Sequence, residues 1–224
     1  MRIHAEFDRR VVVRPGDIDW VASPMHGVER IMLDRIGGEA ARATSIVRYA
    51  PGSYFSAHSH GGGEEFLVLD GVFSDEHGDY PTGTYARNPI GTRHTPHSAD
   101  GCTLFVKLHQ FDPRDTAQKL IRPRDADFVP GLANGVSILP LHEFEGEQAA
   151  LERWQPGTAF HRHRHPGGEE ILVLDGQFED EHGVYAKGTW LRGPDGSEHM
   201  PSSARGCLLY VKSGHLGTQL GAWA

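Results

Sequence analysis

Short runs of alternating apolar and polar residues follow one another along the chain, separated by turns rich in glycine and proline. Alternation with a period of two predicts half-buried β-strands, and runs that favour a helix are few. In the first half of the chain the predicted strands cover residues 42–49, 54–60, 65–69, 72–74, 83–87 and 102–108. Strands at this spacing with no long helix predict an all-β fold, either a small sandwich or a barrel.

The same pattern occurs twice. Residues 51–107, moved by 105 positions, align with residues 156–212 without a gap, and 34 of the 57 aligned pairs are identical. Further upstream RPGDIDW at 14–20 resembles RPRDADF at 122–128, with a shift of 108 positions. The repeat predicts two domains of one architecture, residues 12–113 and residues 122–216. The polar segment 112–124 is the predicted linker.

Composition narrows the class of protein. The chain has 224 residues, a net charge of -8, 38% hydrophobic residues and 23% charged residues, which is typical of a globular protein that buries its own core. The acidic balance argues against nucleic acid and against an anionic membrane surface as partners. Two cysteines are too few for a disulfide framework. With no apolar signal stretch at the start, we expect a cytoplasmic protein.

Each copy contains a histidine-rich stretch, HSHGGGEEFLVLDG at 58–71 and HRHPGGEEILVLDG at 163–176. Two histidines at positions i and i+2 share one face of an extended strand, and a carboxylate follows them. Imidazole and carboxylate together suit divalent transition metals. The pattern therefore predicts that each pair of histidines converges on one metal ion.

The residues around these stretches resemble the two motifs of the cupin superfamily. In copy one, Gly52-x5-His58-x-His60-x3-Glu64-x6-Gly71 fits the first motif and Gly83-x5-Pro89-x-Gly91-x2-His94 fits the second. Copy two repeats both, and Ser98 and Ser203 stand where many cupins have asparagine.

This resemblance implies two tandem cupin barrels, each a double-stranded β-helix or jelly roll with one divalent metal ion. The implied ligands are His58, His60, Glu64 and His94 in the first barrel, and His163, His165, Glu169 and His199 in the second. Zinc or iron is the expected metal, with manganese and nickel as alternatives.

Glu65 and Glu170 are rival carboxylates, because each directly follows the implied glutamate ligand. Strand parity favours Glu64, which shares its face with the two histidines, although the glycines at 61–63 could break that parity. His161 turns the second motif into HRHRH, but it aligns with Ser56. We therefore expect His161 to be a wall residue, and a fifth ligand stays open.

Residues that share the face of the histidines are predicted to line a pocket beside the metal. These wall residues are Tyr54, Ser56 and Phe66 in copy one, and His161 and Ile171 in copy two. Identical ligands inside different walls predict different bound molecules, or one active and one structural site. Drift after duplication explains the difference equally well.

Two further aligned pairs are expected to have structural roles. Cys102 and Cys207 begin alternating strands, where a small buried hydrophobic residue fits better than a redox group. Arg87 and Arg192 precede the second motif, and a structural ion pair is expected rather than an anchor for an anionic substrate.

A closer resemblance is to the ChrR-like cupin family, named after the zinc-binding lobe of certain anti-sigma factors. It rests on H-x-H-x-G-G-E-E-[FI]-L-V-L-D-G and on the spacing to the later histidine. No CxxC motif is present, so we expect a zinc-binding regulatory or stress-sensing cupin rather than an anti-sigma factor.

The segments SPMHGVERIMLDR and ARATSIVRYAPG of copy one also resemble cupins related to dioxygenases that cleave carbon–carbon bonds in diketones or hydroxylated aryl ketones. Whether the chain is an enzyme thus stays open between two functions. One is a mononuclear non-haem metal dioxygenase acting on a small oxygenated organic molecule, with its catalytic site in copy one. The other is a noncatalytic zinc cupin. The expected partner is a small-molecule ligand or substrate, and exposed sheet edges could make a homodimer.

Overall fold

A computed structural model describes residues 1–124 and 127–217. The chain divides into two compact units, the first made of residues 1–5 and 18–123, the second of residues 6–17 and the chain from residue 124 onward. The described residues contain no α-helix and fold as β-strands, which confirms the predicted all-β class. Among them, accordingly, no helix has the length and apolar character needed to cross a membrane.

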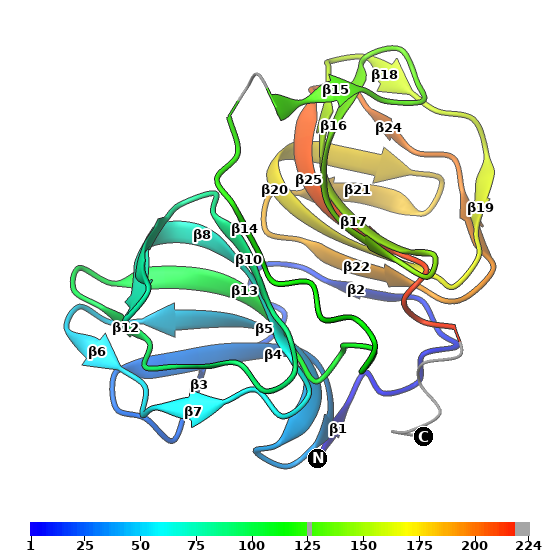
Figure 1. Cartoon of the computed structure of the whole chain (residues 1–224). Helices are drawn as coiled ribbons and strands as arrows, with labels where there is room; N and C mark the ends of the chain where they lie inside the picture. The colour runs from blue at the N-terminus through cyan, green and yellow to red at the C-terminus, as the bar shows by residue number, and fades with distance from the viewer. Residues whose placement is uncertain (125–126, 218–224) are drawn as a thin grey trace. The chain divides into compact units, whose positions relative to one another are not determined.

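The first unit is a barrel of antiparallel strands (Figure 1). Its strands are β1 (Arg2–Ile3), β3 (Val21–Ala22), β4 (Val28–Gly37), β5 (Ala41–Tyr49), β6 (Ser53–Tyr54), β7 (His58–Ser59), β8 (Glu64–Asp75), β9 (Gly78–Pro81), β10 (Tyr85–Asn88), β11 (Arg93–His94), β12 (His97–Ser98), β13 (Cys102–Leu108) and β14 (Lys119–Ile121). The main sheet runs β1-β4-β5-β13-β8-β10-β14. Facing it are β9 and β12, which pair with β8, together with β6 and the two-stranded sheet β7-β11.

The second unit repeats this barrel. Its strands are β2 (Val11–Val13), β15 (Val129–Pro130), β16 (Val136–Phe144), β17 (Glu147–Trp154), β18 (Thr158–Ala159), β19 (His163–His165), β20 (Glu169–Asp180), β21 (Gly183–Ala186), β22 (Trp190–Gly193), β23 (Ser197–His199), β24 (Ser202–Ser203) and β25 (Cys207–Ser213). Its main sheet runs β15-β16-β17-β25-β20-β22-β2, and β19 pairs with β23.

One long strand in each barrel serves both layers. The first half of β8 pairs with β13 and β10, while its second half pairs with β9 and β12. The register shifts between Val68 and Asp70, so a β-bulge lets the strand bend. Gly71 follows the bulge with φ +73, and a Cβ there would collide with the Gly101 carbonyl. The glycine that ends the repeated motif is thus required by this close approach.

The edge strands of the two main sheets are exchanged between the sequence repeats. β2 precedes the RPGD segment of copy one, yet it pairs with β22 in the second unit. β14 precedes the matching RPRD of copy two, yet it pairs with β10 in the first unit. The predicted boundaries placed residues 12–17 in the first domain and treated 112–124 as a polar linker. A local sequence pattern does not reveal which sheet a short strand joins.

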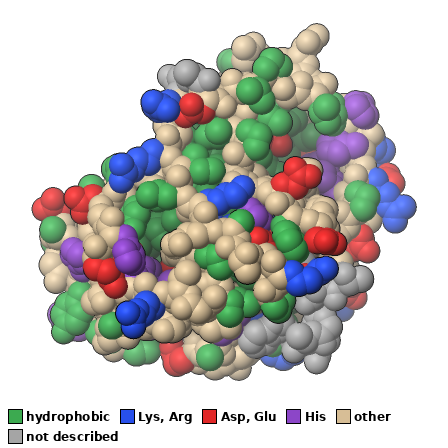
Figure 2. All heavy atoms as spheres, viewed as in Figure 1, with side chains coloured by type: hydrophobic (Ala, Val, Ile, Leu, Met, Phe, Trp, Pro, Cys, Tyr) green, Lys and Arg blue, Asp and Glu red, His purple; other side chains and the backbone are tan. Residues whose placement is uncertain are grey.

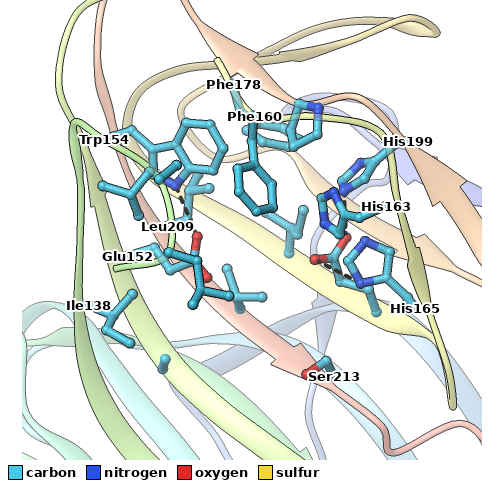
Figure 3. Close-up of a pocket in the computed structure, with 18 of the residues that line it drawn as sticks. Ile138, Glu152, Trp154, Phe160, His163, His165, Phe178, His199, Leu209 and Ser213 are labelled. Atoms are coloured by element: carbon cyan, nitrogen blue, oxygen red, sulfur yellow. Dashed lines mark hydrogen bonds and ion pairs between the residues drawn. The ribbon is translucent and has the colours of Figure 1, made fainter. Parts of the chain in front are cut away.

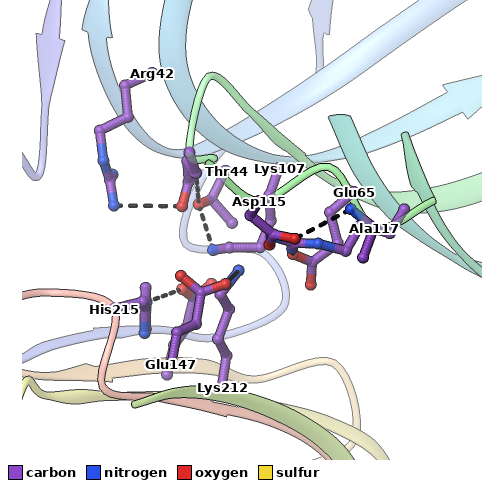
Figure 4. Close-up of polar contacts among 12 residues, drawn as sticks. Arg42, Thr44, Glu65, Lys107, Asp115, Ala117, Glu147, Lys212 and His215 are labelled. Atoms are coloured by element: carbon purple, nitrogen blue, oxygen red, sulfur yellow. Dashed lines mark hydrogen bonds and ion pairs between the residues drawn. The ribbon is translucent and has the colours of Figure 1, made fainter. Parts of the chain in front are cut away.

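Polar side chains on the outer face of each main sheet are buried and paired (Figure 4). In the first barrel Arg87 pairs with Glu65 at 3.0 Å and also with Asp115, and Lys107 donates to Thr44 Oγ1 at 3.0 Å. In the second, Lys212 lies 2.9 Å from Glu147. Partners at this distance compensate for the desolvation of the buried charges. The expected structural ion pair of Arg87 is therefore present.

Candidate metal centres

Four predicted ligands of the first barrel come together at one end of its interior. His58 on β7 lies opposite His94 on β11 in the strand pairing, His60 directly follows β7, and Glu64 begins β8. The Nε2 atoms of His60 and His94 are 3.2 Å apart, and Glu64 Oε2 lies 3.4 and 3.6 Å from them. These four residues form a cluster that could hold a metal ion.

The other nitrogen of each ring faces a hydrogen-bond acceptor. His58 Nδ1 donates to the Ser56 carbonyl at 2.8 Å, which fixes its tautomer because a carbonyl only accepts. The remaining contacts are from His60 Nδ1 to Thr92 Oγ1 at 2.9 Å and from His94 Nδ1 to Asp75 Oδ2 at 3.1 Å. Thr92 Oγ1 in turn donates to the Pro89 carbonyl at 2.7 Å, so it accepts from His60. Such contacts leave the Nε2 lone pairs directed at a common point, as metal-binding histidines require.

The choice between adjacent glutamates follows from the two faces of β8. Glu64 points to the histidines and accepts a hydrogen bond from Asn88 Nδ2 at 3.1 Å. Glu65 points to the opposite face, where it pairs with Arg87. In the second barrel Glu170 likewise points away, accepting from Trp190 Nε1 at 2.7 Å and lying 3.0 Å from His215. The parity argument for Glu64 and Glu169 therefore matches where the structure places them.

The second barrel gathers the aligned residues less tightly. His163, His165 and His199 form a cluster that could hold a metal ion. Glu169 lies 3.6 Å from His165 Nδ1 and 3.5 Å from His199 Nε2. His163 Nδ1 donates to the His161 carbonyl at 3.0 Å, as His58 does to Ser56. His165 departs from its counterpart His60, because its buried Nε2 has no hydrogen-bond partner.

Electrostatics separate the two clusters further. Burial raises the pKa of Glu169 to about 7, and Gly193 stands where Asn88 donates to Glu64 in the first barrel. Burial also lowers the pKa of His165 to about 3, so that ring is neutral and free to bind a cation. Burial opposes protonation of His199 as well, but its hydrogen bond to Asp180 and nearby carboxylates raise its pKa overall.

The cluster of the first barrel opens into a cavity of about 370 Å³. Apolar side chains line most of it, among them Val47, Tyr49, Phe55 and Leu104, with Arg30 on the wall. Tyr54 is 59% exposed and Ser56 is exposed, so neither of these predicted wall residues lines it. Phe55 takes that place, because the irregular segment 55–57 between β6 and β7 interrupts the strand alternation.

The two aromatic residues predicted for the walls differ in outcome. Phe66 is buried against Phe73, with ring centroids 5.0 Å apart, and does not line the cavity of about 370 Å³, but it does line a second cavity of about 310 Å³ beside His94. His161 is exposed and packs on Phe160, with ring centroids 4.1 Å apart. It lies outside the cluster of three histidines. Among the predicted residues, Ile171 does line the cavity of the second barrel.

The cavity of the second barrel, about 280 Å³, contains a carboxyl group that the sequence analysis missed (Figure 3). Glu152 on β17 lies on its wall with Trp154, Phe160 and Leu209. Its Oε2 accepts a hydrogen bond from Trp154 Nε1 at 2.9 Å. Strand pairing shows that Val47 is its counterpart in copy one, because Val47 lies opposite Leu104 and Glu152 lies opposite the aligned Leu209. Figure 2 shows histidines beside hydrophobic side chains at the upper right, on this barrel.

The serines that replace the usual asparagine have structural roles. Ser98 Oγ donates to the Val72 carbonyl at 2.6 Å, and Ser203 Oγ donates to the Gln177 carbonyl at 2.5 Å. Both therefore tie β12 and β24 to the long strands. Cys102 and Cys207 are buried and unbridged, and burial raises the pKa of each thiol to about 11. At that pKa neither thiol is a reactive thiolate at neutral pH.

Solved structures with the same fold are distant in sequence. A proposed dioxygenase from Nostoc punctiforme is 13% identical, with 94% of this chain and 85% of that chain covered and a TM-score of 0.75. A protein from Pseudomonas aeruginosa that is proposed to be glyoxylate-induced is 12% identical. The match covers 91% of this chain and 88% of that chain, with a TM-score of 0.73. The bacterial pirin YhhW from Escherichia coli, in complex with nickel(II), is 13% identical, with 92% and 98% covered and a TM-score of 0.65. At these identities the likeness shows the cupin fold alone.

A search of curated protein sequences gives no significant match. The ChrR Cupin-like domain family, by contrast, matches twice, over residues 8–112 and residues 116–217. The first match includes the cluster of His58, His60, Glu64 and His94, and the second includes the cluster of His163, His165 and His199. The chain therefore belongs to the ChrR cupin-like family and carries two tandem cupin domains.

Proposed function

We propose that the protein binds one divalent metal ion in each barrel and that the first barrel is a mononuclear non-haem metal dioxygenase for a small oxygenated organic molecule. One observation carries the metal assignment. The Nε2 atoms of His60 and His94 lie 3.2 Å apart beside the Glu64 carboxylate, while the Nδ1 atom of each ring contacts a hydrogen-bond acceptor. The lone pairs of these Nε2 atoms repel each other unless a proton or a cation lies between them, and a metal ion meets all three histidines at once.

The surroundings of the first cluster support an enzyme. Its rings are held by Ser56, Thr92 and Asp75, and Asn88 orients Glu64, so the ligands are preorganised. A bound metal with three histidines and one carboxylate would supply open positions for a substrate oxygen and for dioxygen. The apolar wall with Val47, Phe55 and Leu104 would exclude water and contact the carbon skeleton of the substrate.

Oxygen consumption tests this function. Protein purified without added metal is analysed for its elements, loaded with Fe(II) and offered a panel of diketones and hydroxylated aryl ketones. We expect iron-dependent oxygen uptake that is lost in His58→Ala and His94→Ala and retained in His163→Ala. A folded, iron-loaded protein that is inert to the whole panel contradicts the proposal.

Membership of the ChrR cupin-like family favours a second candidate, a zinc-binding regulatory cupin without catalysis. It predicts two zinc ions per chain and a lower midpoint of thermal unfolding after chelation, because metal binding stabilises the folded state. Redox-active iron with turnover would remove this candidate.

A further inference from the structure

Each cavity contains one cross-strand pair whose charge differs between the barrels. In the first barrel Arg30 on β4 lies opposite Val47 on β5. In the second barrel Ile138 on β16 lies opposite Glu152 on β17. All four side chains line their own cavities. In the first barrel this place holds Arg30, which pairs at 3.1 Å with Glu39 on the same cavity wall, whereas in the second barrel it holds the carboxyl group of Glu152.

Glu152 is enclosed by apolar groups. Its neighbours on the cavity wall are Ile138, Trp154 and Leu209, and Figure 3 shows its carboxyl pointing into the cavity that the three histidines also line. The Trp154 indole is its hydrogen-bond donor. Among the residues that the structure describes, no cationic side chain pairs with Glu152. An acidic group in such surroundings costs free energy, which a cationic ligand would offset.

We propose that the second cavity binds a small apolar molecule with a protonated amine, and that Glu152 is the ion-pair partner of that amine. The ammonium group lies against the carboxyl oxygens, while the apolar body packs against Phe160, Phe178 and Leu209. The proposal concerns the cavity of the second barrel, whose histidines the proposed function assigns to a metal ion, but it needs no metal. The first cavity, with Val47 and Arg30 in these places, does not bind such a molecule.

The protonation state of Glu152 agrees with this assignment. Burial raises its pKa, and the hydrogen bond from Trp154 opposes the rise only in part. His199 is the cationic group whose charge favours ionisation of Glu152. An ammonium group in contact with the carboxyl favours its ionised form and so opposes the rise in pKa that burial causes.

Benzylamine is the probe, with benzyl alcohol as its neutral and benzoate as its anionic counterpart. Full-length protein labelled with ¹⁵N-tryptophan reports on the site through the indole N–H resonance of Trp154, which Trp154→Phe identifies by its loss. Titrations are made after chelation and again after zinc loading. We expect benzylamine to shift this resonance and to bind at least about tenfold more tightly than either counterpart in both metal states, as a desolvated ion pair requires.

Two variants of Glu152 decide the assignment. Glu152→Gln keeps the size and an acceptor for Trp154, and Glu152→Val copies the first barrel. We expect both to remove the preference for benzylamine over benzyl alcohol while keeping the circular dichroism spectrum of the folded protein. An unchanged preference in Glu152→Gln, or no shift of the Trp154 resonance, overturns the proposal. Loss of metal binding with benzylamine binding intact would contradict the proposed metal function and leave this one standing.

Discussion

The two barrels have matching main sheets and three aligned histidines, yet they hold the aligned glutamates, Glu64 and Glu169, differently. In the first barrel Asn88 donates a hydrogen bond to Glu64. In the second, Gly193 occupies the aligned position and the pKa of Glu169 rises to about 7 through burial. The two copies have thus kept the residues that could hold a metal ion and differ in the groups that control their charge and orientation. The comparison teaches that cluster and wall must be assigned separately in each barrel.

The strongest test removes one metal at a time. His94→Ala should lower the metal content from two ions per chain to one, and His199→Ala should do the same in the other barrel, because each cluster lies wholly within its own unit. Elemental analysis of dialysed protein measures the stoichiometry. Loss of both metals in either single variant would show that the sites depend on each other.

The exchanged edge strands predict which barrel each sequence copy stabilises. Successive backbone N–H groups of a strand point to opposite sides, so replacing both Val12 and Val13 by proline removes a hydrogen bond to β22. We expect a loss of about 1–3 kcal/mol in the free energy of unfolding of the second barrel, because a backbone carbonyl of β22 loses its hydrogen-bond donor. Hydrogen exchange of β20 and β22 compared with β8 and β10 measures it.

The matched control replaces Leu120 and Ile121 by proline in β14, which pairs with β10. This control should speed hydrogen exchange in the first barrel and leave exchange in the second barrel slow. Faster exchange in the first barrel of the Val12 and Val13 variant would contradict the assignment of β2.

Exchanging Asn88 and Gly193 tests what the amide contributes. Asn88→Gly removes the hydrogen bond to Glu64 and should weaken metal binding in the first barrel about tenfold to a hundredfold. Gly193→Asn should strengthen metal binding in the second barrel, because a hydrogen-bond donor near Glu169 favours the ionised form of its carboxyl group. Competition with a chromogenic chelator measures both affinities, with the other cluster disabled by its histidine variant. Equal affinities before and after the exchange would leave the amide without a role.

The smallest expected effect is a pH dependence of the second barrel. Metal binding must displace the proton from Glu169, whose pKa is about 7, so affinity should rise with pH up to that value by at most about tenfold per unit. In the absence of metal, the stability of the folded state should change with pH in the opposite direction. The folded state then binds more protons than the unfolded state, and stability falls as pH rises from about 4.5 toward 7. Metal titrations and thermal unfolding in the His94→Ala background measure the two trends, and Glu169→Gln should flatten both.

Much of the architecture was predictable because it depends on local patterns. Period-two alternation indicated the strands, the i, i+2 spacing of His58 and His60 indicated a metal site, and the resemblance to the cupin motifs added His94. The wall was harder to predict, because Phe55 reaches the cavity through an irregular segment where parity does not hold. Glu152 was missed since a charged residue on a strand is usually solvent-exposed, and only the closure of the sheet places it inside. The partner sheet of β2 depends on long-range pairing, which no local pattern encodes.

The exchange of β2 and β14 also bears on how such a chain arose. One repeat on its own encodes a sheet whose last edge is completed by a strand from the other repeat. An ancestor with a single copy would leave that edge open, or complete it by exchanging edge strands with a second molecule, as in a domain-swapped dimer. Fusing two copies makes the strand exchange intramolecular, so it no longer depends on protein concentration. Either repeat expressed alone should therefore dimerise or aggregate, whereas the full chain satisfies both edges itself.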